Sequence, residues 1–401
     1  MAEGVRMTGE LPLEGVVVVS LEQAVAAPFA SRQLADLGAR VIKVERPGVG
    51  DFARGYDKEV KGMSAAFIWL NRSKESLTLD LKHKEASTII TRLLEGADVF
   101  IQNLAPGAAA RLGLSGQALV EQYPRLIVCN ISGYGSGGPY SKKKAYDLLI
   151  QCETGLVSIT GTPDTPCKVS ISIADIATGM YAYSGILTAL YKRQKTGRGT
   201  EFEVSMLEAL GEWMITPGYF AAYGDGPPPR SGASHASIYP YGPFETGDGK
   251  AIFFGIQNER EWKNFCADVL VRPDLAKNPR FESNTKRLNN ASELAPIIEN
   301  LFQQLDGQEV LSRLEQAQIA NANLNSAKEF WDHPQLRARK RWREIDSPVG
   351  TIESMLPAVT MEGVIPRMDP VPALGQHTKQ ILRELGYTDD AIDELADGGA
   401  I

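Results

Sequence analysis

The chain has 401 residues, of which 43% are hydrophobic and 23% are charged, so it can bury a large core and exceeds the usual size of one domain. Its 42 basic and 49 acidic residues give a net charge of −7, and it has no long basic run that would bind a phosphate backbone. The composition therefore predicts two domains of unequal size and argues against a nucleic-acid partner.

Alternating apolar strand and helix patterns fill the first part of the chain. Residues 15–21 predict a buried strand, residues 27–38 a helix with Pro28 in its first turn, and residues 39–45 a second strand. The same pattern predicts strands at residues 76–81, 98–103 and 125–131 and a helix at residues 84–97. This order is typical of a doubly wound α/β domain.

A Gly- and Pro-rich stretch at residues 223–234 predicts a domain boundary. Residues 241–256 predict a hairpin that turns at Gly247-Asp248-Gly249. The helices predicted after it, which would complete a smaller α+β domain, cover residues 259–270, 293–305 and 308–319. The last helical stretches, 377–386 and 389–396, follow a Pro-rich segment and could return to the first domain.

Cysteine and histidine spacing does not indicate a metal site. Cys129, Cys152, Cys167 and Cys266 lack the close pairs of a zinc site, and the four histidines lack the i, i+4 spacing of a helical site. No stretch approaches the roughly 18 apolar residues of a membrane span, and the N-terminus lacks the apolar core of a signal peptide. We expect a soluble, cytoplasmic protein with no metal and no membrane partner.

Common catalytic motifs are also absent from the sequence. The first strand-to-helix turn, residues 21–28, contains no glycine, which argues against dinucleotide binding even though Glu45 ends the second strand as an acidic ribose ligand would. Residues 135–138 do not form the G-x-S-x-G turn of a serine hydrolase, and no cysteine lies in an evidently electropositive setting.

Asp175 is a single carboxylate within an apolar stretch. One interpretation makes it the N-cap of the helix that follows, since aspartate accepts backbone N–H bonds at that position. The other makes it a nucleophile, because the small side chains of Ala174, Ala177 and Gly179 leave room for a bulky acyl group. Local sequence leaves both interpretations open.

Residues 174–206, which surround Asp175, resemble a motif of the class III CoA-transferases, the formyl-CoA transferase family. Further matching motifs cover residues 34–51, 71–82, 103–114, 131–140 and 374–387. The resemblance implies an α/β fold with a discontinuous Rossmann-like large domain, a smaller α+β domain and an interlocked homodimer. The large domain would comprise residues 1–222 and a return segment, 326–401, and the linker and small domain would comprise residues 223–325.

The family's catalytic aspartate matches Asp175. The resemblance implies that Asp175 attacks an acyl-CoA thioester to give a mixed anhydride, that the CoA thiolate then forms an aspartyl-CoA thioester, and that an acceptor carboxylate reverses these steps. An anhydride retains the energy of the thioester, which an ester of serine would largely lose. CoA is then a substrate, and we expect no tightly bound cofactor.

The family's CoA contacts fall on residues that follow the predicted strands. The matching positions are Val25, Ala26, Arg46, Leu79, Lys82, Asn103, Leu104, Arg111, Gly133 and Tyr134. Arg46, Lys82 and Arg111 are suited to neutralise phosphates. A non-catalytic acyl-CoA-binding protein would keep these cations but would not need Asp175.

Two departures from the family pattern narrow the expected reaction. The racemase branch carries a histidine where this chain has Tyr146, and the glycine run of the formyl-CoA transferases is replaced by residues 230–244. The chain most resembles the branch that acts on C4 to C5 dicarboxylic acids, so we expect intramolecular transfer on mesaconyl-CoA or, alternatively, transfer from succinyl-CoA to itaconate, citramalate or malate. Candidates for holding the second carboxylate are Arg230, Ser231, His235 and Tyr239.

Overall fold

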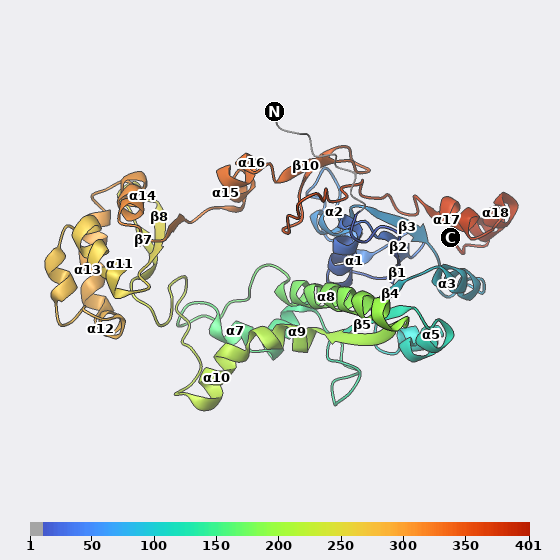
Figure 1. Cartoon of the computed structure of the whole chain (residues 1–401), viewed down its shortest axis with the longest axis horizontal. Coiled ribbons are helices and arrows are strands. Elements are labelled where there is room, and N and C mark those ends of the chain that lie inside the picture. The colour runs from blue at the N-terminus through green and yellow to red at the C-terminus, as the bar shows by residue number, and fades with distance from the viewer. Residues whose placement is uncertain (1–10) are drawn as a thin grey trace. The chain divides into compact units, whose positions relative to one another are not determined.

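The computed structural model describes residues 11–401 and forms two compact units (Figure 1). The first unit contains the chain up to Gly155, together with Val169–Ile215 and Leu336–Ile401, and the second contains Leu156–Lys168 and Thr216–Gln335. Each unit therefore collects segments that are distant in the sequence.

A six-stranded parallel sheet forms the centre of the first unit, in the order β3-β2-β1-β4-β5-β6. The strands are β1 (Val17–Leu21), β2 (Arg40–Glu45), β3 (Lys74–Thr78), β4 (Val99–Gln102), β5 (Ile127–Ser132) and β6 (Thr200–Ser205). Val18 of β1 lies opposite Val41 of β2 on one side and Val99 of β4 on the other. The strand order reverses between β1 and β4, and α/β proteins bind ligands beyond the carboxyl ends of the strands at such a point.

Helices cover both faces of this sheet because successive strand residues point to opposite faces. One face packs against α1 (Ala26–Asp36) and α8 (Ile173–Thr196), which lie side by side in Figure 1. The other face packs against α3 (Ala86–Glu95), α5 (Gly116–Gln122), α17 (Thr378–Glu384) and α18 (Asp389–Asp397). The terminal helices therefore belong to the core of the first unit, as Ile381 and Leu382 are fully buried there.

Shorter elements complete the first unit. They are the 3₁₀ turn Phe52–Gly55, α2 (Ala65–Asn71), α4 (Ala108–Arg111), α6 (Asp147–Glu153), α9 (Met206–Trp213) and the hairpin of β10 (Trp342–Ile345) and β11 (Ile352–Met355). Most of these elements connect the strands of the sheet, and the loops beside them carry the predicted site.

The second unit has a three-stranded antiparallel sheet, in the order β7-β8-β9, packed against helices. Its strands are β7 (Tyr241–Glu245), β8 (Ala251–Gly255) and β9 (Asn321–Asn323). Its longer helices are α11 (Glu259–Asn264), which continues as the π-helix Phe265–Val269, α12 (Asn284–Asn289), α13 (Ala291–Phe302) and α14 (Gly307–Gln316). The hairpin predicted at residues 241–256 is confirmed, with its turn at Gly247–Gly249.

Several connecting helices belong wholly or partly to the second unit. They are α7 (Leu156–Ile159), the 3₁₀ turn Pro273–Lys277, α10 (Ile215–Tyr223), α15 (Ala327–Trp331) and α16 (Pro334–Ala338). None of the helices within residues 11–401 is long and apolar enough to cross a membrane.

Candidate active site

The predicted CoA contacts of the first unit lie just after the strands of the parallel sheet. Val25 and Ala26 follow β1, Arg46 follows β2, Leu79 and Lys82 follow β3, Asn103 and Leu104 follow β4, and Gly133 and Tyr134 follow β5. Because the carboxyl ends of parallel strands meet at one edge of a sheet, these positions share that edge. Arg111 ends α4, the helix that follows Asn103 and Leu104.

Three cations of this set are exposed and unpaired. The side chains of Arg46, Lys82 and Arg111 have no hydrogen bond or ion pair with any residue of the described chain, 11–401. A guanidinium or ammonium group without an internal partner can pair with a phosphate at no cost to an existing salt bridge.

Two predicted contacts have structural roles that the sequence did not indicate. The side chain of Leu79 is 1% exposed and packs in the core, so only its backbone is available to a ligand. The Asn103 amide nitrogen donates to the Gln23 carbonyl at 2.8 Å, and its oxygen accepts from the Gln23 N–H at 2.9 Å. Asn103 therefore holds the turn between β1 and α1.

The loop after β5 depends on a close approach at Gly133. A Cβ atom at this position would lie 2.3 Å from the Cβ of Ala145, so only glycine lets residues 133 and 145 approach each other. The rings of Tyr134 and Tyr140 pack edge to face, with 5.3 Å between their centres. Lys143 Nζ lies 4.3 Å from the centre of the Tyr140 ring. This loop leads directly to α6, which begins at Asp147.

Asp175 lies in the first turn of α8 and is not its N-cap. The helix begins at Ile173, and the cap position is Ser172, which makes no side-chain capping bond, so the interpretation of Asp175 as a cap is wrong. Asp147 of α6 takes that role, since its Oδ1 accepts from the N–H groups of Ala174 at 2.8 Å and Asp175 at 3.3 Å. Within residues 11–401 the Asp175 carboxylate has no hydrogen bond or ion pair of its own.

The acidity of Asp175 is strongly perturbed. The side chain is half-buried, and its burial, followed by the charge of Asp147, raises its pKa to about 7. Burial and then the charges of Asp51 and Asp175 also raise the pKa of Tyr56 to about 12, which places Tyr56 within electrostatic reach of Asp175. Strongly shifted carboxylates beside a ligand-binding edge are typical of catalytic groups.

Close packing of α8 on α1 brings Asp175 to the start of α1. A Cβ atom at Gly179 would lie 2.6 Å from the Ala26 carbonyl oxygen, so the two helices are in contact at this point. Asp175 is one helical turn before Gly179 and lies on the same side of α8. The acid therefore lies next to the turn that carries Val25 and Ala26.

Sequence reasoning did not assign a role to Asp147 or Tyr56. Asp147 follows Tyr146, the residue that replaces the racemase histidine. This position next to a family motif could have indicated that Asp147 belongs to the site. Asp51 is the last residue of the motif covering residues 34–51, and Tyr56 lies five residues after it. No local pattern connects Tyr56 to Asp175.

The candidates for holding a second carboxylate lie in the second unit and already make local contacts. Arg230 donates three hydrogen bonds to the carbonyl oxygens of Ser158, Thr162 and Pro163. Ser231 Oγ donates to the Ser234 carbonyl, and the His235 ring stacks on the Tyr241 ring. The Tyr239 backbone donates its N–H to Asn284 and accepts from Arg287 at its carbonyl. Their role in substrate binding stays a prediction.

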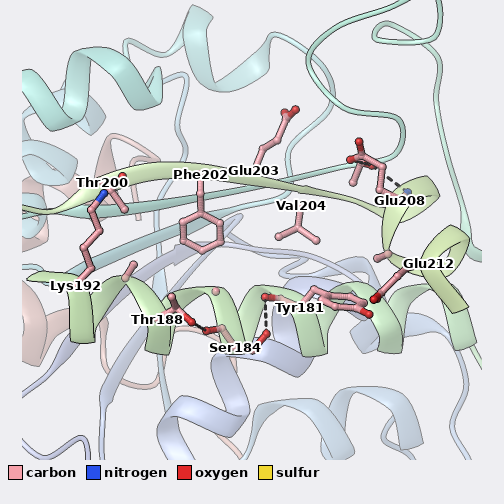
Figure 2. A pocket seen from close by; sticks show the side chains of 14 residues that line it. Tyr181, Ser184, Thr188, Lys192, Thr200, Phe202, Glu203, Val204, Glu208 and Glu212 are labelled. Atoms are coloured by element: carbon pink, nitrogen blue, oxygen red, sulfur yellow. Dashed lines mark hydrogen bonds between the residues drawn. The ribbon is translucent and has the colours of Figure 1, made fainter.

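A separate cavity of about 530 Å³ lies between α8, β6 and α9. Figure 2 shows Phe202 and Val204 of β6 pointing toward the Tyr181, Ser184 and Thr188 face of α8. None of the predicted catalytic or CoA-binding residues lines this cavity. Within residues 11–401, no cluster of three or more His, Cys, Asp or Glu side chains could hold a metal ion.

Comparisons with known proteins extend over nearly the whole chain. The sequence model of CoA-transferase family III matches residues 13–378. Succinyl-CoA:glutarate CoA-transferase from Homo sapiens is 34% identical over 395 residues, covering 97% of this chain and 90% of the relative. The succinyl-CoA–L-malate CoA-transferase beta subunit from Chloroflexus aurantiacus is 30% identical over 407 residues, covering 97% and 98%. A crystal structure of a CaiB/BaiF family protein from Brucella suis matches with a TM-score of 0.83 and 30% identity, covering 94% of this chain and 100% of that one.

Proposed function

Because the chain belongs to CoA-transferase family III, we propose that it moves CoA between C4 and C5 dicarboxylic acids through a thioester on Asp175. The proposal rests on the burial, position and lack of a partner of this carboxylate. Asp175 is half-buried, has no partner among the described residues and lies at the start of α1, beside the edge of the sheet where the predicted CoA contacts gather. A structural acid would normally be paired or hydrogen-bonded.

The proposed reaction needs only the two substrates and Asp175. An Asp175 oxygen attacks the donor thioester carbon, the C–S bond breaks, and the CoA thiolate leaves a mixed anhydride behind. The thiolate then attacks the Asp175 carbonyl carbon, which releases the donor acid and leaves an aspartyl-CoA thioester. The acceptor carboxylate attacks the same carbon, CoA leaves again, and its attack on the acceptor acyl group regenerates Asp175.

The similar enzymes favour succinyl-CoA as the donor. Both relatives described above carry succinyl-CoA in their names, one with glutarate and the other with L-malate as its partner. Both partners are dicarboxylic acids of four or five carbons, which agrees with the acceptor size expected from the sequence. Intramolecular transfer on mesaconyl-CoA, the first expectation from the sequence, becomes the second candidate.

We further propose that Arg46, Lys82 and Arg111 bind the phosphates of acyl-CoA and that the enzyme is an interlocked homodimer. The cations are exposed and unpaired among the described residues. Support for a dimer comes from the exposed aromatic residues of α10, of which Tyr219, Phe220 and Tyr223 are 62%, 53% and 86% exposed. A single chain leaves this helix without a covered apolar face.

Asp175→Asn tests the nucleophile directly. Asparagine has nearly the same size, and the hydrogen bonds from Ala174 and Asp175 to Asp147 use backbone N–H groups, so the variant should fold as the wild type does. An amide cannot form the anhydride, so transfer should fall below a few per cent of wild type. Hydroxylamine or borohydride added during turnover should mark the peptide containing residue 175 in the wild type only. Substantial transfer by Asp175→Asn with no marked peptide would refute the mechanism.

A substrate panel separates the two candidate reactions. The protein is incubated with succinyl-CoA and glutarate, malate, itaconate or citramalate, and separately with mesaconyl-CoA alone, and the CoA products are identified by mass spectrometry. Formation of the acceptor's CoA ester supports intermolecular transfer. Isomerisation of mesaconyl-CoA without an acceptor supports the second candidate, and absence of any CoA exchange with these acids would refute the substrate class.

A further inference from the structure

Four charged side chains are completely buried next to the start of α1. Lys43 Nζ lies 2.7 Å from Asp51 Oδ2, and Lys74 Nζ lies 2.7 Å from Glu22 Oε1, with all four side chains 0% exposed or nearly so. We call Glu22, Lys43, Asp51 and Lys74 the buried charge cluster. Its two cations and two anions balance, so the cluster carries no net charge.

Stability alone is a weak reason for such a cluster. Removing four charges from water costs more than most buried ion pairs return, and apolar side chains of similar size are often equally stabilising. The pattern of contacts points to another role, because the cluster bonds both the turn between β1 and α1 and the first turn of α1 itself. Asp51 Oδ1 accepts from the Ala24 N–H at 3.0 Å, and Lys74 Nζ donates to the Pro28 carbonyl at 3.0 Å.

The turn itself has an unfavourable backbone conformation. Ala24 has a φ of 64°, in the left-handed region that residues with a Cβ atom avoid. The bond from its N–H to Asp51 opposes relaxation to the ordinary right-handed or extended regions. Asp51 is fixed in turn by Lys43 and by its own N–H, which donates to Glu45 Oε1 at 3.0 Å.

The strained residue directly precedes the proposed CoA contacts. Val25 and Ala26 begin α1, which has no side-chain cap and no acidic residue in its first turn. Their N–H groups have no hydrogen-bond partner among residues 11–401. The direction of these N–H groups depends on the backbone at Ala24, because its φ and ψ angles set the course of the chain into the helix.

We infer that Asp51, paired with Lys43, is a positioning residue of the acyl-CoA site, which holds Ala24 in the left-handed conformation and thereby presents Val25 and Ala26 to the CoA substrate. The inference rests on the proposed function, since it assumes that CoA binds at this turn. The inference also assigns a function to the motifs at residues 34–51 and 71–82. These motifs contribute Lys43, Asp51 and Lys74 to the buried charge cluster.

Two double variants keep or remove Asp51 Oδ1, which accepts from the N–H groups of Ala24 and Ala53, and the rescue at residue 24 then separates these two bonds. Both replace Lys43 by Met, so that no buried cation is left without its partner, and they differ only at residue 51. In Lys43→Met/Asp51→Asn the amide oxygen can still accept from Ala24, whereas in Lys43→Met/Asp51→Ala nothing can. Calorimetric titration with free CoA should give a dissociation constant at least tenfold higher for the Ala variant than for the Asn variant.

Ala24→Gly provides the rescue that a merely structural role would not show. Glycine adopts a φ of 64° without strain. Added to Lys43→Met/Asp51→Ala, it should recover most of the lost CoA affinity, whereas in the wild-type background it should change that affinity less than threefold. Melting temperatures are recorded for every variant, and they are expected to shift by similar amounts when Ala24→Gly is added to either background.

A single substitution covers the case in which the double variants do not fold. Ala24→Val leaves the buried charge cluster intact, but a β-branched side chain strongly disfavours the left-handed region. It should weaken CoA binding at least tenfold in a folded protein.

Three results would overturn the inference: equal CoA affinity of the Ala and Asn variants, an equal effect of Ala24→Gly in both backgrounds, or wild-type affinity in Ala24→Val. Failure of the wild-type protein to bind CoA would instead refute the proposed function, and the inference with it. The wild-type titration and the Asp175→Asn assay therefore distinguish the two kinds of failure.

Discussion

The carboxylates of Asp147 and Asp175 lie near the start of α8 and differ in their hydrogen bonding. Asp147 accepts from the first backbone N–H groups of the helix, whereas the Asp175 carboxylate has no hydrogen bond or ion pair among the described residues. Burial, followed by the charge of the nearby Asp147, raises the pKa of Asp175. A nucleophile that ionises near neutral pH is poised between its inactive acid form and its reactive carboxylate.

The pH dependence of transfer should report the pKa of Asp175. With a pKa of about 7, the carboxylate fraction increases with pH, so kcat/KM should rise about tenfold per pH unit below pH 7 and level off above it. Asp147→Asn removes the second charge while its amide oxygen can still accept from Ala174, so the midpoint should move to lower pH. Steady-state kinetics from pH 5 to 9 measure both profiles, and an unchanged midpoint would mean that Asp147 acts only as a cap.

The exposed cations give a second prediction at the level of single residues. Arg46→Ala and Arg111→Ala should each weaken CoA binding by about 1 to 3 kcal/mol, the size of a hydrogen bond to a charged group. Arg339→Ala is the matched control, because Arg339 is exposed and lies outside the predicted site. Titrations at low salt keep screening small. Wild-type affinity in both site variants would remove Arg46 and Arg111 from the site.

Among the secondary-structure elements, contact between α1 and α8 positions Asp175, the proposed nucleophile. The two helices come from parts of the chain more than a hundred residues apart, and Gly179 permits their close approach. A Cβ atom at residue 179 would meet the Ala26 oxygen at 2.6 Å and Phe29 Cδ1 at 2.9 Å. The Ala26 oxygen belongs to the backbone and cannot retreat without moving α1.

Gly179→Ala should therefore impair both stability and transfer. Overpacking of this kind costs about 1 to 3 kcal/mol of unfolding free energy, and displacement of α8 from Ala26 should reduce kcat/KM at least tenfold. Gly211→Ala in α9 is the control, since nothing lies within 4 Å of its Cβ position and alanine favours a helix by up to about 1 kcal/mol. Denaturant unfolding and the transfer assay test both variants. Equal behaviour of the two would contradict the role of this contact.

The sequence predicts the elements better than their contacts. The strands of the sheet from β1 to β5 and the helices α1 and α3 lie within a few residues of the predicted ranges, because their apolar periodicity is strong. β6 was missed, although Thr200–Ser205 alternates charged and half-buried residues, a pattern typical of a strand with one exposed face. The residue that caps α8 was not identified, because Asp147 reaches the helix from 28 residues away, a contact that no local pattern records.

For the site residues too, the sequence predicts positions better than contacts. Positions just after the parallel strands share one edge of the sheet, because the carboxyl ends of parallel strands meet there. Local sequence does not reveal that Asn103 bonds the Gln23 backbone or that Asp51 bonds Ala24, since both contacts join segments that are brought together only by the fold.

At the scale of the whole molecule, the course of the chain suits the proposed interlocked dimer. The chain leaves the first unit after Ile215, forms most of the second unit and returns at Leu336 to complete the first. In the proposed dimer, each chain passes between the two connections of the other, and chains interlocked in this way cannot separate while both remain folded.

Interlocking makes a prediction that an ordinary dimer does not share. Light scattering at micromolar concentration should give twice the mass of the chain. When tagged and untagged dimers are mixed under native conditions, affinity capture should recover no hybrid after a day, because exchange requires a chain to unfold and withdraw from its partner. Unfolding in denaturant and joint refolding should then produce hybrids in about half of the dimers, the proportion expected from random pairing of equal amounts. A monomeric mass would refute the dimer, and rapid native exchange would show two chains that associate through their surfaces without being threaded through each other.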